Sequence, residues 1–133
     1  MKTHYAIALS VLTAIGGAAA VQGLHAQGKP PVYFVTEMEV ANPDAYGTDY
    51  HPKALASIKA AGGRQLAVGG SGGGGAKTLT AIEGNPPKRV VIHVWDSLEK
   101  LQAWRNGDDY KEARKIGDKH ATFRSFAIEG LSQ

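Results

Sequence analysis

The sequence predicts a single α+β domain with a ferredoxin-like βαββαβ order, in which two helices cover one face of an antiparallel sheet. Three observations support this fold class. The chain of 133 residues is long enough for one core only. Two stretches rich in alternating or β-branched residues, 32–40 and 89–95, are each followed by a helix-start signal. The absence of cysteine excludes a disulfide scaffold and a thiolate metal site.

Residues 1–26 have the pattern of a secretory signal peptide, with a basic residue near the start, an apolar run and a small-residue exit at Ala26. A membrane anchor is the alternative, but the apolar run at 6–20 is shorter than the roughly 20 residues that a spanning helix needs. We therefore expect export to the periplasm or the cell exterior, with no membrane attachment after cleavage. An exposed leader at 27–31 would then precede the folded domain at 32–131.

The charge of the chain indicates no particular partner. The formal net charge is +3, and the 15 lysines and arginines are scattered, with no run longer than a pair such as Lys88-Arg89. Nucleic-acid binding and a polybasic membrane patch both need clustered basic side chains, so neither is expected.

The domain is expected to begin with a strand at 32–40, whose apolar residues alternate with polar or mixed ones. An Asn-Pro pair at 42–43 supplies an N-cap and a proline in the first turn, which predicts a helix. Pro52 lacks an N–H and crowds the preceding turn. The helix should therefore bend near 50–51 and continue to residue 61.

The middle of the chain predicts a short strand at 64–68, a glycine-rich hairpin insertion at 69–75 and a returning arm at 78–83. The aliphatic run at 89–95 is the clearest strand and is expected at the centre of the sheet. The insertion contains the spacing Gly70-x-Gly72-x-x-Gly75, but a dinucleotide site needs such glycines to open a helix. Because the next residues alternate like a strand, we interpret the glycines as a flexible hairpin tip.

The last third of the chain predicts a second helix and a fourth strand. Asp96, with a glutamate three residues later, resembles a capping box that opens the helix. The expected inward face of this helix consists of Leu98, Leu101 and Trp104. Gly107 should interrupt the helix, and a strand at 121–130 should end the domain.

One face of the predicted sheet has no helix to cover it. On parity we place Tyr33, Val35, Val91 and Trp95 there, where they would expose aromatic and aliphatic area to water. Exposed patches of this kind usually mark association. We therefore expect a homodimer that closes face to face, forming a dimeric α/β barrel.

His93 is the candidate catalytic residue, because it interrupts an aliphatic strand and, on the same parity, falls on the helix-free face. Glu37 would lie diagonally from it, about 7–8 Å away, close enough to orient the imidazole. Such a pair predicts a general base and its positioning partner; alternatively, the two residues satisfy each other or bind groups across the dimer. Tyr33 and Trp95 are the expected walls of the ligand site, and the strand residue Arg64 the expected carboxylate binder.

No metal site and no cofactor are expected. The histidines of the domain are His51, His93 and His120, and none stands in a His-x-x-x-His or His-Glu pair. A haem-ligand role for His93 or His120 stays open. The serines lack a nucleophile-elbow motif, so nucleophilic hydrolysis is not expected.

A series of short motifs runs through the domain in a fixed order. They are Tyr33-Phe34-Val35, Asn42-Pro43-Asp44-Ala45-Tyr46, Gly62-Gly63-Arg64, Arg89-Val90-Val91-Ile92, Trp95-Asp96-Ser97-Leu98-Glu99, Ala103-Trp104 and Tyr110. In combination they resemble the domain-of-unknown-function 1330 family over roughly residues 32–131. The resemblance implies a ferredoxin-like fold in the dimeric α/β-barrel superfamily and no established reaction. Relatives in that superfamily include cofactor-free oxygenases, haem-using enzymes and lactone isomerases, so activity does not follow from fold.

The leading hypothesis is an exported domain that binds a small organic molecule and converts it by cofactor-independent proton abstraction. The alternative is a non-catalytic dimeric structural or interaction module. Nothing in the sequence identifies the ligand.

Overall fold

The computed structural model describes residues 29–132 of the chain. The predicted signal peptide at 1–26 lies outside the described residues, as does the first part of the predicted leader. Among the helices of the described part, none is long and apolar enough to cross a membrane.

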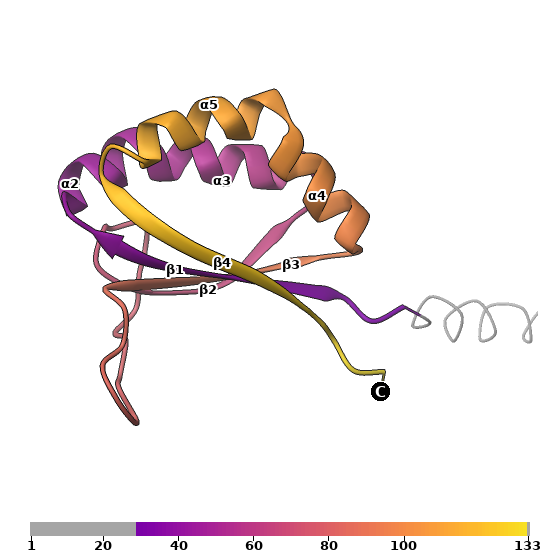
Figure 1. Ribbon diagram of the computed structural model, residues 1–133, viewed down its shortest axis with the longest axis horizontal. Helices are drawn as coiled ribbons and strands as arrows, with labels where there is room; N and C mark the ends of the chain where they lie inside the picture. Colours follow the sequence, from indigo (N-terminus) through magenta and orange to yellow (C-terminus); the bar gives the residue numbers. More distant parts are fainter. Residues whose placement is uncertain (1–28, 133) are drawn as a thin grey trace, which may run out of the picture.

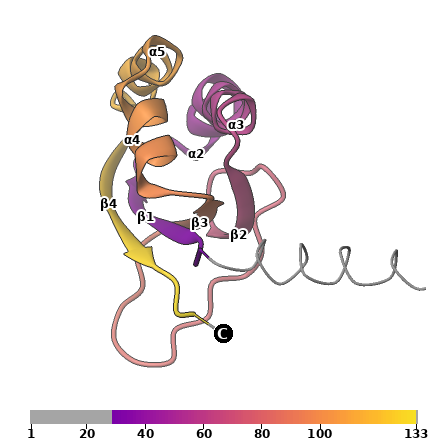
Figure 2. The same cartoon turned by 90° about the vertical axis from the view of Figure 1, so that its right-hand side faces the viewer.

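Four strands form one antiparallel sheet in the spatial order β2-β3-β1-β4. The strands are β1 at Val32–Val40, β2 at Arg64–Gly70, β3 at Arg89–Trp95 and β4 at Ala121–Glu129. The helices lie together on one face of this sheet (Figures 1 and 2). The ferredoxin-like α+β class and the central place of β3 are therefore confirmed.

The first helical segment changes type along its length. It begins with α2 at Pro43–Ala45, where the Asn42 side chain accepts a hydrogen bond of 3.1 Å from a backbone N–H of the first turn. A π-helical turn, η1 at Tyr46–Tyr50, follows, and α3 continues over His51–Ala60. The predicted break before Pro52 falls where η1 meets α3, because proline has no N–H with which to continue the ladder.

The second helical segment consists of α4 at Leu98–Asn106 and α5 at Asp108–Gly117. The predicted interruption at Gly107 is confirmed, since this residue has extended dihedral angles and caps both helices. Two aromatic side chains of this segment, Trp104 and Tyr110, are buried against the sheet, with ring centroids 4.2 Å apart.

The N-terminus of α4 differs from the prediction by one residue. Ser97 is the cap, and its hydroxyl accepts a hydrogen bond of 3.2 Å from the backbone N–H of Lys100. Asp96 instead pairs with the Lys100 ammonium at 2.9 Å. The cap at Ser97 makes Leu98 the first residue of the helix, ahead of the turns that pack on the sheet, and this side chain is 45% exposed rather than inward.

The prediction of a returning strand at 78–83 is wrong, because the structure has no strand there. The backbone of this connection pairs with β2 through an isolated bridge between Gly69 and Lys77, and residues 78–83 form no ladder with it. Ile82, an apolar residue of the expected arm, is 93% exposed. The alternation of residue types at 78–83 is not enough to form a strand, because a strand also needs a neighbouring strand edge to hydrogen-bond with and a core against which to bury one face.

The core fills the layer between the sheet and the helices. The even-numbered residues of β1 face the helices, and they contribute to two clusters of buried side chains. One cluster surrounds Met38 and Tyr46; the other surrounds Phe34, Trp95 and Trp104. The rings of Trp95 and Trp104 lie 5.2 Å apart, so the second cluster ties β3 to α4.

Candidate functional site

The register of β1 against β3 decides which side chains face the helices. Phe34 lies opposite His93, and Thr36 lies opposite Val91. Side chains directly opposite each other in an antiparallel pair share a face. Because Phe34 is buried under the helices, the odd-numbered residues of β3, Trp95 among them, are buried there too. We call this side of the sheet the helix-covered face and the other side the helix-free face.

The prediction that Val91, His93 and Trp95 lie on the helix-free face is therefore wrong. The reason is that the polar residues of this inner strand, Arg89 and His93, lie on its buried side, whereas its other side is wholly aliphatic. Polar residues usually mark the side that faces solvent, so here they suggest the wrong one. Trp95 is only 1% exposed, beneath the helices, and is not among the residues that line the cavity described below.

The predicted pair of His93 and Glu37 does not form, because the two residues lie on opposite faces of the sheet. Glu37 is opposite Val90 on β3 and Arg124 on β4. Its carboxylate forms an ion pair with the Arg124 guanidinium. Glu37 therefore has a partner of its own and cannot position His93.

The two remaining predicted ligand residues also lie away from His93. Tyr33 is on the helix-free face and is 37% exposed. Arg64 is exposed on the edge strand β2, opposite Val94, which again places it on the helix-free face. Of the five predicted site residues, His93 is the one that faces the cavity under the helices.

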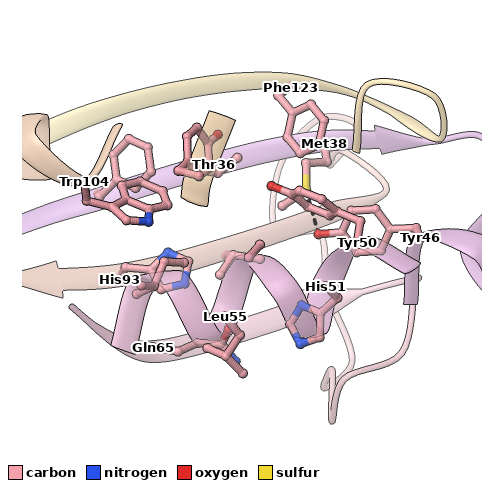
Figure 3. A pocket seen from close by; sticks show the side chains of 15 residues that line it. Thr36, Met38, Tyr46, Tyr50, His51, Leu55, Gln65, His93, Trp104 and Phe123 are labelled. Atoms are coloured by element: carbon pink, nitrogen blue, oxygen red, sulfur yellow. Dashed lines mark hydrogen bonds between the residues drawn. The ribbon is translucent and has the colours of Figure 1, made fainter. Parts of the chain in front are cut away.

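That cavity lies between the sheet and the helices and has a volume of about 30 Å³. This is room for one or two water molecules. Figure 3 shows His93 and Trp104 toward one end of it, and Met38, Tyr46 and Tyr50 toward the other. The rest of the lining is formed by Phe34, Thr36, His51, Ala54, Leu55, Ile58, Gln65, Val91, Tyr110 and Phe123.

His93 is the most unusual group in this lining. The residue is 7% exposed, and neither Nδ1 nor Nε2 has a hydrogen-bond partner among the described residues. Its ring stacks on Phe34 with centroids 6.5 Å apart. Burial, with a smaller contribution from His51, lowers the pKa of His93 to about 4. The imidazole is therefore neutral at pH 7 and carries one free basic nitrogen.

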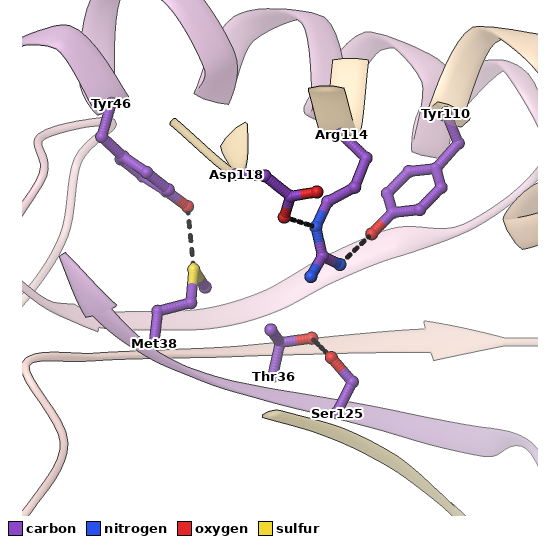
Figure 4. Close-up of polar contacts among 7 residues, drawn as sticks. All are labelled: Thr36, Met38, Tyr46, Tyr110, Arg114, Asp118 and Ser125. Atoms are coloured by element: carbon purple, nitrogen blue, oxygen red, sulfur yellow. Dashed lines mark hydrogen bonds and ion pairs between the residues drawn. The ribbon is translucent and has the colours of Figure 1, made fainter. Parts of the chain in front are cut away.

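Several other polar side chains that line the cavity are already paired, as Figure 4 shows for most of them. The Tyr46 hydroxyl donates to the Met38 sulfur at 3.1 Å, and Thr36 accepts from Ser125 at 3.1 Å. The Arg114 guanidinium donates to the Tyr110 hydroxyl at 3.0 Å. Trp104 Nε1 similarly donates to Ser57 Oγ at 3.0 Å. Against this background, the unpaired nitrogens of His93 stand out as available to a ligand.

A second group with unpaired donors, Arg89, lies against Tyr46 and outside the set of residues that line the cavity. Arg89 is 0% exposed, and its Nη1 donates to the carbonyl oxygens of Ser71 at 2.5 Å and Gly73 at 3.1 Å. Its Cζ lies 5.0 Å from the centroid of the Tyr46 ring. Nε and Nη2 have no partner among the described residues. The pKa of nearby His51 is lowered by burial and then by the Arg89 charge.

The glycine run at 69–75, which we call the glycine strap, packs against this end of the cavity. Gly72 and Gly74 have φ of +92° and +69°, and a Cβ on Gly72 would lie 2.8 Å from the Tyr46 ring. A Cβ on Gly74 would collide with the His51 imidazole. The strap is thus held against α3 and η1 by close packing and by Arg89. The predicted hairpin tip thus packs behind Tyr46 and His51, two residues of the cavity lining.

Arg89, His51 and the glycine strap are the site features that the sequence interpretation missed. The signal was present in the spacing, because Arg89 and His93 are four residues apart on one strand and must share a face. Correct assignment of that face would have placed both under the helices. Nothing in the sequence, by contrast, indicates that the strap folds back over His51.

Among residues 29–132, no group of three or more His, Asp or Glu side chains is placed to hold a metal ion. The cavity beside His93 is also far smaller than a porphyrin. The arrangement around His93 therefore does not fit a haem ligand.

Comparison with known proteins gives a family and a fold. Residues 31–131 match the family described as "Domain of unknown function (DUF1330)". Among curated proteins, nothing matches the chain.

Three solved structures resemble this fold at low sequence identity. A protein of unknown function from Rhodopseudomonas palustris has 16% identity and a TM-score of 0.56, with 90% of this chain and 98% of that chain covered. SnoaB, a cofactor-independent oxygenase from Streptomyces nogalater, has 14% identity and a TM-score of 0.55, covering 78% and 96%. A Bacteroides thetaiotaomicron protein described as a "possible oxidoreductase" has 12% identity and a TM-score of 0.52, covering 76% and 98%. At these identities the likeness concerns the fold.

Proposed function

We propose that this chain, which belongs to the DUF1330 family of domains of unknown function, binds a small organic molecule in the cavity beneath its helices, with His93 as a general base. The observation that carries this proposal is a buried histidine whose two ring nitrogens have no hydrogen-bond partner among residues 29–132. An unpaired polar group in the interior costs free energy, and a ligand that hydrogen-bonds it recovers that cost.

The proposed chemistry is proton abstraction from an activated carbon or hydroxyl of the ligand. The neutral imidazole nitrogen accepts the proton, so an N–H bond forms while the C–H or O–H bond breaks, and the electron pair stays on the ligand. Because the pKa of His93 is about 4, the base stays unprotonated through the neutral range but needs an acidic proton to abstract. Phe34 and Trp104 would hold the apolar body of the ligand.

A ligand larger than two waters needs the cavity to widen. Leu55 and Gln65 are the partly exposed residues of its lining on the α3 and β2 side, and their side chains are the simplest to displace. SnoaB, a cofactor-independent oxygenase, has a similar fold, which supports a reaction without a cofactor between the sheet and the helices. It does not identify the substrate.

A ligand screen by thermal shift tests the proposal on wild-type protein, His93→Ala and the matched control Glu37→Gln. We expect compounds that stabilise wild type and Glu37→Gln, and that lose the shift in His93→Ala. Equal stabilisation of all three proteins would place the binding site elsewhere.

Proton exchange gives a separate test of the base. In D2O, wild-type protein should speed the loss of the central C–H signal of 2,4-pentanedione above the buffer rate, whereas His93→Ala should not. An unchanged rate in the two proteins would contradict the role of His93 in proton transfer.

The second candidate function is association through the helix-free face. Three of its side chains are well exposed for apolar residues, namely Tyr33 at 37%, Phe126 at 41% and Ile128 at 55%. They lie on the adjacent strands β1 and β4, where Tyr33 is opposite Ile128. A second copy of the chain is the occupant that we propose, because the patch is apolar and the Glu37–Arg124 ion pair beside it is already neutralised within one chain. Light scattering should give a dimer mass for wild type and a monomer mass for Phe126→Asp with Ile128→Asp; equal masses would contradict it.

Export is the remaining proposal, and it rests on the pattern of residues 1–26. Expression of the full chain in a bacterial host with a periplasm should give a product that begins at Gln27. Intact-mass measurement of the periplasmic and cytoplasmic fractions would show this. A full-length product confined to the cytoplasm would contradict it.

A further inference from the structure

We propose that the ligand of this site carries a carboxylate, which binds to Arg89, a side chain that lies against Tyr46 at one end of the cavity. This inference rests on the proposed function and names the chemical class of the ligand. It follows from the charge, the burial and the unpaired donors of one side chain.

Arg89 is a buried charge without a counter-ion. Its residue exposure is 0%, and none of the ion pairs among the described residues includes it. An arginine stays protonated at any accessible pH, so the guanidinium cannot become neutral to escape the cost of burial. Burial of an unpaired ion carries a large desolvation cost, and the Tyr46 ring and the two strap carbonyls offset only part of it.

The donors that remain free have the geometry that a carboxylate needs. Nη1 is used by the strap carbonyls of Ser71 and Gly73. Nε and Nη2 are unpaired, and they form one side of the guanidinium, with two nearly parallel N–H bonds. A carboxylate binds such a side with both oxygens, and an amide or alcohol cannot match that arrangement.

The position of Arg89 relates it to His93. Both side chains lie on the helix-covered face of β3, with Val91 between them, so their Cα atoms are about 13 Å apart along the strand. His51 lies near both, since the Arg89 charge lowers the pKa of His51 and His51 lowers the pKa of His93. A carboxylate at Arg89 would therefore leave the rest of a small ligand pointing toward the imidazole.

Arg89 is not among the residues that line the cavity, but Tyr46 and His51, which neighbour it, are. The strap touches both His51 and Arg89 and binds the guanidinium through Nη1, so a carboxylate on Nε and Nη2 leaves these carbonyl contacts in place. The alternative is a purely structural arginine that only fixes the strap. The two roles differ in whether the site distinguishes an anion from a neutral molecule of the same shape.

Benzoate and benzamide make this comparison, because they share a shape and differ in charge. Calorimetric titration of wild-type protein should show at least tenfold tighter binding of benzoate. Arg89→Met should lose this preference and keep the affinity for benzamide, whereas Glu37→Gln should keep both. Arg89→Lys keeps the charge without the paired N–H groups, so we expect it to lose most of the preference while the strap stays in place.

A spectroscopic measurement on wild type avoids the question of whether Arg89→Met folds. The Nε–H signal of Arg89 should shift in NMR spectra on addition of benzoate and stay unmoved with benzamide. Equal binding of both probes, with a response that depends on His93, would overturn this inference and leave the proposed function standing. A lack of binding by either probe, in calorimetry and in the NMR spectra, would count against both.

Discussion

Both faces of the sheet carry polar side chains next to apolar ones, but the two faces differ in the burial and the pairing of those polar side chains. On the helix-covered face, His93 and Arg89 are buried with nitrogens that no described residue pairs. On the helix-free face, Glu37 and Arg124 pair with each other beside exposed apolar side chains. An unpaired polar group costs free energy only where water cannot reach it. The comparison teaches that burial and pairing, rather than residue type, separate a candidate ligand site from a surface for association.

The largest expected difference between the faces comes from removing one aromatic side chain on each. Trp104→Ala deletes a buried ring that contacts Phe34, Trp95 and Tyr110, and should lower the free energy of unfolding by about 3–5 kcal/mol. Phe126→Ala removes a ring that is 41% exposed, and should cost about 1 kcal/mol or less in the monomer. Urea denaturation at low protein concentration measures both values. Similar losses of unfolding free energy in the two variants would contradict this difference between the two faces.

Acid should lower the unfolding free energy of the domain through the buried histidines on the helix-covered face. The pKa of His93 is about 4 in the folded protein, below its ordinary value, so the unfolded chain binds more protons between about pH 4 and 6.5. Stability should therefore fall as the pH drops through this window, by about 3 kcal/mol from His93, and stay level above it. The lowered pKa of His51 acts in the same direction.

His93→Leu removes this titration and provides the comparison. The difference in unfolding free energy between wild type and His93→Leu, measured by denaturation at several pH values, should change across pH 4–6.5. A difference that stays constant over that range would show that His93 titrates alike in the folded and unfolded chains.

The contrast between the faces also shows how far the sequence could lead. The fold class follows from local signals such as the strand at 32–40 and the break before Pro52, because alternation and proline chemistry act through neighbouring residues. The face of His93 does not follow from local signals, because β3 buries its polar side, and only its register with β1 shows which side that is. The positions of Arg89 and the strap depend on contacts between distant segments. The helix and strand propensities of single residues do not encode such contacts.

The glycine strap gives a smaller effect with a matched control. Gly73 and Gly74 have nearly equal φ, of +67° and +69°, so alanine carries about the same backbone cost, roughly 1–2 kcal/mol, at either position. A Cβ on Gly73 meets nothing within 4 Å, whereas one on Gly74 collides with His51. Gly74→Ala should therefore lose about 1–2 kcal/mol more than Gly73→Ala and should alter ligand affinity. Equal losses in thermal denaturation would mean that the strap does not pack on His51.

The smallest effect is expected from the ion pair on the helix-free face. The Arg124 side chain is 76% exposed, and solvent screens its interaction with Glu37. Glu37→Gln should therefore change the unfolding free energy by less than about 1 kcal/mol and leave ligand affinity unchanged. A loss of ligand binding in this variant would return the site to the helix-free face.

The central claim is that ligands bind beneath the helices at His93, and NMR spectra with assigned aromatic signals test it most directly. Benzoate and benzamide are the two probes. On addition of a probe that binds, the ring signals of His93 and Trp104 should shift, while those of Tyr33 and Phe126 should stay in place. Shifts confined to Tyr33 and Phe126, with His93 unmoved, would contradict the account.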